Sequence, residues 1–81
     1  MRITYDRDAN AAYIHLTGDE LGAGRDTVIA AAPQGSSATA ILDWKDGRLV
    51  GIEVLDADQT LHQDLLDQAE DTSTARSTAT A

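Results

Sequence analysis

Apolar and polar residues alternate along the chain in two short segments near its start, residues 1–6 and 11–17. A period of two is typical of half-buried β-strands. The four residues between the segments, "RDAN", have the character of a turn. A hairpin through this turn gives the following cross-strand pairs: Asp6 with Ala11, Tyr5 with Ala12, and Ile3 with Ile14. This register places the apolar side chains on one face, as a half-buried sheet requires.

Three further segments have the composition of strands. They are "TVIAAA" at residues 27–32, "ATAILDW" at residues 38–44 and "RLVGIEVL" at residues 48–55. Pro33 lacks a backbone donor and ends the first of them. The glycines of "GDELGAG", from Gly18 to Gly24, predict a flexible loop before these strands.

The last two strands form a second hairpin whose register depends on the length of its turn. A two-residue turn at Asp46-Gly47 would bring Asp43 onto the apolar face. A three-residue loop at residues 45–47 instead gathers the apolar side chains, with these pairs: Leu42 with Val50, and Ala40 with Ile52. Loops of this length usually contain a left-handed residue, which glycine accommodates without strain. We therefore expect the three-residue loop, with Gly47 at positive φ.

The period changes after Leu55, and leucines recur at helical spacing over residues 61–70. Thr60 and Gln63 fit a capping box, with Asp58 as an alternative start. From residue 71 the sequence "DTSTARSTATA" contains no large apolar side chain and predicts a disordered tail. The fold class is thus α+β: one domain, residues 1–70, with an antiparallel sheet of about five strands (two hairpins plus a middle strand) and one C-terminal helix.

Composition narrows the range of functions. The chain has 81 residues, no cysteine, and 14 acidic against six basic residues, a net charge of −8. Disulfides and thiolate metal sites are therefore excluded. The negative charge argues against nucleic acid and anionic membranes as partners, and is compatible with a basic protein. Because no long apolar run or leader is present, we expect a cytoplasmic protein.

The acidic residues of the second hairpin do not form a recognisable site. Asp43 and Asp46 lack the regular ligand spacing of a calcium loop and fit an Asp-Gly turn. Glu53 and Asp56 lie on opposite faces by parity, so they cannot act together on one substrate atom. The two histidines, His15 and His62, are too few and too dispersed for a metal site. We predict no catalytic residue, no cofactor and no bound metal, and hence no enzyme.

The face of the sheet opposite the main apolar set, here called the second face, is mixed in character. By the expected register it carries nine side chains: Tyr13, His15, Ile29, Ala31, Ile41, Asp43, Leu49, Glu53 and Leu55. Mixed patches of this kind often mark interaction surfaces. The candidate interaction residues are Tyr13, His15, Ile29, Ile41, Leu49 and Leu55. The alternative is that the sheet curls, or its loops fold, to cover this face from within.

Two blocks of the sequence resemble a family of small bacterial proteins, domain of unknown function 2283. They are "ITYDRDANAAYIHL" and "ILDWKDGRLVGIEVLDA", which is the more specific. Asn10 stands where an acid is usual in the family, and Ala12 where leucine is usual. The resemblance implies a small β-sheet protein and no particular activity. Some members are encoded beside small toxin-like proteins, which implies an antitoxin-like role as one alternative.

Three functional hypotheses follow. The first is a non-enzymatic interaction protein, either a homodimer or a module that binds another protein. The second is an antitoxin-like partner of a small basic toxin. The third, an enzyme or a metal binder, has the least support from the residues.

Overall fold

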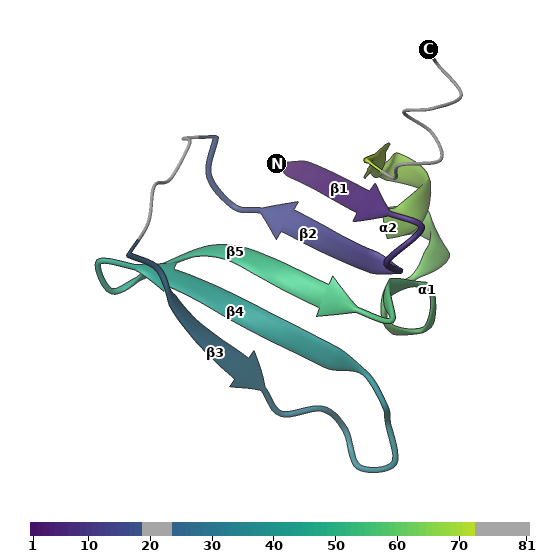
Figure 1. Cartoon of the computed structure of the whole chain (residues 1–81), viewed down its shortest axis with the longest axis horizontal. Coiled ribbons are helices and arrows are strands. Elements are labelled where there is room, and N and C mark those ends of the chain that lie inside the picture. Colours follow the sequence, from purple (N-terminus) through teal and green to yellow (C-terminus); the bar gives the residue numbers. More distant parts are fainter. Residues whose placement is uncertain (19–23, 73–81) are drawn as a thin grey trace.

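The computed structural model describes residues 1–18 and 24–72. Its six-stranded sheet has the strand order β3-β4-β5-β2-β1-β6, with two short helices after β5 (Figure 1). The elements are β1 (Arg2–Asp6), β2 (Ala11–His15), β3 (Asp26–Ala30), β4 (Thr39–Lys45), β5 (Arg48–Leu55), α1 (Ala57–Thr60), α2 (Gln63–Gln68) and β6 (Glu70–Asp71). The expected α+β class is confirmed, with a sixth strand and a second helix that the sequence did not predict.

The first hairpin has the predicted register. β1 and β2 pair antiparallel with Ile3 opposite Ile14 and Tyr5 opposite Ala12. The Asp6 carboxylate stabilises the turn, because it accepts hydrogen bonds from the backbone amides of Asp8 at 3.0 Å and Ala9 at 3.3 Å. Short polar side chains that bond to nearby backbone amides favour turns for this reason.

The register predicted for the second hairpin is wrong. The turn has two residues, Asp46 and Gly47, both at positive φ (52° and 77°), as the turns of tight hairpins require. Lys45 pairs with Arg48, and an irregularity at Asp43/Trp44 then shifts the pairing by one residue. The observed pairs are therefore Leu42 with Ile52 and Ala40 with Val54.

This β-bulge explains why residues 51–55 of β5 keep their predicted faces despite the error in register. A two-residue turn alone would have moved Leu42 to the face of Gly51. The extra residue that a bulge inserts into one strand reverses that change. Leu42 consequently shares a face with Ile52, as the apolar pattern predicted, but it lies two residues further along β5.

Two short helices replace the single helix expected over residues 61–70. α1 begins directly after β5, where Asp56 adopts a left-handed conformation (φ 51°). Leu61 and His62 are extended and separate α1 from α2. The ring of His62, rather than Thr60, caps α2 by accepting a hydrogen bond from the amide of Asp64 at 3.1 Å.

The hydrophobic core lies between the helices and one half of the sheet. It is centred on Ala12, Val54 and Ala57, which are at most 2% exposed. The partly buried side chains packed against them are Tyr5, Ile52, Leu61 and Leu66. Two of the leucines that predicted a helix, Leu61 and Leu66, therefore pack against this core as expected, although Leu61 lies in the extended segment between α1 and α2.

The sixth strand extends the sheet into the segment expected to be a tail. Glu70 and Asp71 pair in parallel with Thr4 and Tyr5 of β1, and the amide of Thr72 donates to the Tyr5 carbonyl at 2.9 Å. The expectation of disorder is thus wrong for residues 71 and 72. Its remainder, residues 73–81, lies outside the described residues. So do residues 19–23, most of the predicted loop from Gly18 to Gly24.

Candidate functional site

The second face can be followed strand by strand from the register. One row across the sheet contains Thr4, Tyr13, Glu53, Ile41 and Ile29. The next row contains Arg2, His15, Gly51, Asp43 and Thr27. A third row includes Leu55, opposite Ala11 and Thr39. Five of the six candidate interaction residues, Tyr13, His15, Ile29, Ile41 and Leu55, thus lie on this face.

Leu49 does not belong to the second face. It lies opposite Trp44, whose neighbour along β4, Asp43, faces the other way. The register expected from the sequence placed Leu49 on the second face, because that register contained no bulge. In the structure the bulge places Leu49 on the face that carries Leu42 and Ile52. The remaining predicted member, Ala31, lies beyond the end of β3.

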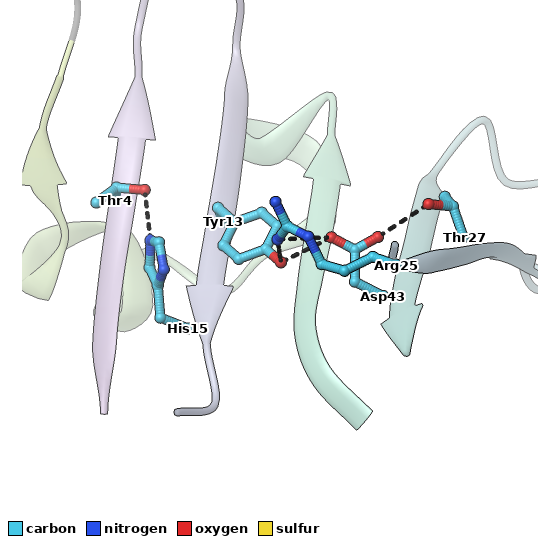
Figure 2. Close-up of polar contacts among 6 residues, drawn as sticks. All are labelled: Thr4, Tyr13, His15, Arg25, Thr27 and Asp43. Atoms are coloured by element: carbon cyan, nitrogen blue, oxygen red, sulfur yellow. Dashed lines mark hydrogen bonds and ion pairs between the residues drawn. The ribbon is translucent and has the colours of Figure 1, made fainter. Parts of the chain in front are cut away.

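Tyr13 reaches across β5 to Asp43 on β4 (Figure 2). Its hydroxyl donates to the Asp43 carboxylate at 2.7 Å, although β5 lies between the two strands. Gly51 makes this path available: a Cβ atom at that position would overlap the Tyr13 hydroxyl and ring. A glycine inside a strand often marks such a close approach. The glycine of "VGIE" therefore serves a cross-strand contact that the sequence analysis did not identify.

Two further side chains complete the surroundings of Asp43. Thr27 on β3 donates to its second oxygen at 3.2 Å. The Arg25 guanidinium lies 3.6 Å from the carboxylate and donates to the Tyr13 hydroxyl at 3.3 Å. The Asp43 side chain is 14% exposed and has a partner for each oxygen. We call Tyr13, Arg25, Thr27 and Asp43 the polar network; it links β2, β4 and β3.

The environment of Tyr13 favours a neutral phenol. Burial, and then the hydrogen bond and negative charge of Asp43, raise the pKa of Tyr13 above its usual value of 10.0. The phenol therefore stays protonated and donates to Asp43 at neutral pH. A raised pKa is the opposite of what a tyrosine base or nucleophile needs. The polar network is thus suited to holding strands together and not to proton transfer.

His15 extends this arrangement toward β1. Its ring lies 4.6 Å from the ring of Tyr13, and its Nε2 is 3.4 Å from the hydroxyl of Thr4. Burial and the nearby positive charge of Arg2 lower the pKa of His15 below 6.5, against a smaller opposing effect of Glu70. His15 is therefore neutral at physiological pH.

Glu53 differs from the other charged residues of the second face. It is half-buried between Ile41 and Tyr13, its cross-strand neighbours. No described residue forms a hydrogen bond or ion pair with its side chain. Arg2 and Arg25, the arginines beside this face, are engaged by Glu70 at 2.6 Å and Asp43 at 3.6 Å. The carboxylate of Glu53 thus stands without a compensating charge, next to an apolar strip formed by Ile41 and Ile29.

The remaining acids and histidines that the sequence raised lie apart. Asp46 is in the exposed β4–β5 turn, Asp56 precedes α1, and His62 caps α2. Within residues 1–18 and 24–72, no three His, Cys, Asp or Glu side chains come together as a metal site would require. The expectation that no metal is bound stays a prediction.

A shallow groove of about 390 Å³ lies beside α2. Its lining includes Arg7, Asp58, Asp67 and Asp71. Each acid has a partner: Asn10 donates to Asp58 at 2.6 Å, Gln63 donates to Asp67 at 2.8 Å, and Arg7 lies 3.8 Å from Asp71. The acidic side chains that line the groove, between the β1–β2 turn and α2, are therefore paired within the chain.

The fold and this surface define the class of the protein: a small α+β domain with helices on one face of a mostly antiparallel sheet and a mixed, partly exposed second face. The chain belongs to the family described as protein of unknown function (DUF2283), whose model matches residues 2–57. No curated protein and no solved structure matches the chain. The match covers β1 to β5 and ends at Ala57, which confirms the resemblance and assigns no activity. Among the described residues no helix is long and apolar enough to cross a bilayer.

Proposed function

We propose that the protein is a non-enzymatic module that self-associates through the outer edge of β3. The observation that supports this proposal is the exposure of that strand: among the described residues β3 is the last strand on its side of the sheet, and Val28 and Ile29 are 51% and 71% exposed. An edge strand presents unpaired backbone groups that pair readily with a further strand. Exposed β-branched side chains on both faces of the edge add apolar contact to such pairing.

The opposite edge of the sheet is protected by comparison. β6 has two residues, Glu70 and Asp71, both acidic, and the Arg2–Glu70 ion pair lies beside it. Short strands and charges are common ways in which proteins block edge pairing. β3 has five residues with a single charge, Asp26, at its start. When two copies pair through β3 about a two-fold axis, their six-stranded sheets join into one and neither β3 edge stays exposed.

Charge sets the conditions for this association. Each chain carries a net charge of −8, so two copies repel each other at low ionic strength. Moderate salt screens this repulsion over about 10 Å at 0.1 M and should therefore tighten the dimer. We further propose that the protein acts in the cytoplasm without a cofactor, as its composition indicates.

The test is a measurement of molar mass by light scattering and of dimer affinity by analytical ultracentrifugation, with and without salt. Val28→Lys places a charge on the β3 edge and should weaken the dimer by about tenfold or more, since lysine is a common edge protector. Gln59→Lys adds the same charge on exposed α1 and should leave the affinity unchanged. A wild-type protein that is monomeric at high concentration and in salt, or a Val28→Lys variant that dimerises normally, contradicts the proposal.

A further inference from the structure

The central position of Glu53 distinguishes the second face from the β3 edge. β5 lies third in the strand order β3-β4-β5-β2-β1-β6, so Glu53 is in the interior of the face and away from both edges. Ile41 flanks it on β4, and Ile29, which is 71% exposed, continues the same row on β3. Leu55, two residues along β5, is 37% exposed. Apolar side chains thus lie on two sides of the Glu53 carboxylate. Ile41 and Ile29 lie across the neighbouring strands, and Leu55 lies along β5.

The charge of Glu53 limits what can cover this surface. A partner that buries the apolar side chains also removes water from the carboxylate, and a buried carboxylate is stable only when it is paired. The two arginines beside the face have acidic partners of their own and cannot supply the charge without giving them up. No cation of residues 1–18 and 24–72 pairs with Glu53 within the chain, so the surface is suited to a molecule that brings its own positive group.

A second copy of the chain does not meet this requirement. A two-fold axis through the middle of the second face would bring the two Glu53 carboxylates together, because a two-fold interface presents the same patch from both sides. Like charges placed opposite each other disfavour the complex. The β3 edge, which carries no such group in its middle, is the better surface for self-association.

We propose that the second face binds a partner protein through a lysine or arginine that pairs with Glu53 and is flanked by apolar side chains that cover Ile41, Ile29 and Leu55. The polar network beside this surface holds β2, β4 and β3 in register, so that the acidic and apolar groups are presented at fixed positions. Tyr13, the other cross-strand neighbour of Glu53, offers an aromatic ring beside the cation. The proposal is independent of self-association, which uses a different surface.

A short peptide tests the chemistry directly. Titration of the isotope-labelled full chain with acetyl-Leu-Arg-Leu-amide, followed by NMR, should shift the amide signals of Glu53, Ile41 and Leu55 most strongly. The citrulline analogue, acetyl-Leu-Cit-Leu-amide, has nearly the same shape without the charge. It should bind about tenfold more weakly or worse, as expected for loss of a charge pair. Equal binding of the two peptides, or shifts centred elsewhere, overturns the proposal.

A matched pair of variants assigns the effect to one carboxylate. Glu53→Gln keeps the size of the side chain and should reduce binding of the arginine peptide by about tenfold. Asp46→Asn removes the same charge from the exposed β4–β5 turn, at a left-handed position that asparagine tolerates, and should change binding by less than about twofold. Equal effects of the two substitutions would indicate general charge attraction and overturn the proposal.

Self-association of the Glu53→Gln variant provides the last check. We expect its dimer affinity to equal that of the Asp46→Asn variant, which has the same net charge, because β3 lies at the edge and not at Glu53. If Glu53→Gln instead tightens the dimer more than Asp46→Asn does, a second copy occupies the second face and the proposal fails. A Val28→Lys variant that still dimerises contradicts only the β3 edge, so the two proposals fail separately.

Discussion

The two halves of the sheet have similar patterns of apolar and polar residues and different surroundings. β1, β2 and β5 are covered on one face by the helices, and the buried residues Ala12 and Val54 belong to them. β3 and β4 lie beyond this cover, where Val28 is 51% exposed. Both halves alternate apolar and polar residues, so the pattern alone does not reveal which half is buried. The comparison separates a half that supplies stability from a half that is available for contact.

The largest effect on stability should come from a buried charge. It is tested by placing an aspartate in each half of the sheet in turn. Val54→Asp buries an unpaired carboxylate in the core and should cost at least about 3 kcal/mol, a large share of the stability of so small a domain. Val28→Asp, on the exposed strand, should cost under about 1 kcal/mol. Urea denaturation of the two variants measures both values. Similar losses would mean that β3 is packed as tightly as β5.

The next effect concerns Gly51, which lies at the junction of the two halves. Gly51→Ala displaces the Tyr13 ring from β5 and breaks its hydrogen bond to Asp43, at a cost of about 2 kcal/mol. In a Tyr13→Ala background the same substitution should cost much less, because nothing remains to be displaced. A double-mutant cycle should thus give a coupling of about 1 kcal/mol or more. Additive costs would show that Tyr13 does not depend on Gly51.

A smaller effect is expected at the turn that holds β4 against β5. Gly47→Val forces a branched side chain into the left-handed region and should cost about 1–2 kcal/mol. A Cβ atom there would meet no described neighbour within 4 Å, so the whole cost comes from the backbone. Gly18→Val, at a glycine that has no described neighbour within 4 Å and a backbone that is not left-handed, is the control and should be close to neutral. Thermal denaturation distinguishes the two, and equal stability would contradict the strained turn.

The smallest expected effect is a dependence of stability on pH, which comes from His15 in the half of the sheet that the helices cover. Because the pKa of His15 is lowered in the folded protein, the unfolded state binds more protons in the window between the two pKa values. Stability from this residue is therefore complete above pH of about 6.5, falls as the pH drops through that window, and levels off below the folded pKa. His15→Asn should remove this component when melting temperatures of variant and wild type are compared from pH 7.5 to 5. Identical pH profiles would show that His15 titrates normally.

The sequence predicted the first hairpin in full, since its register depends only on alternation and a four-residue turn. It also placed β5 at residues 48–55, as observed. The predicted register of the second hairpin was wrong by two residues because a bulge leaves no mark in the apolar pattern. The shift caused by the shorter turn and the shift caused by the bulge together return residues 51–55 to the faces predicted for them. Gly51 was the available signal, as a glycine in the middle of an apolar strand.

Other features arise from backbone contacts that side-chain patterns do not report. β6 was missed because Glu70 and Asp71 are polar and their pairing with β1 uses main-chain groups. The break between the helices was missed because the leucine spacing continues across it, while the extended backbone of Leu61 and His62 interrupts the hydrogen bonding. The polar network was beyond prediction for a different reason, since it joins three strands whose order in the sheet the sequence did not specify.

The strand order also determines how the chain must assemble. β1 and β2 are neighbours in sequence, and so are β3, β4 and β5, so both groups form from local contacts. They are joined at one seam, where His15 of β2 meets Gly51 of β5. Closing a long segment of chain is slow compared with forming a hairpin. We therefore expect two rapidly formed hairpin units whose docking at the β2–β5 seam sets the folding rate, with β6 added from the far end of the chain last.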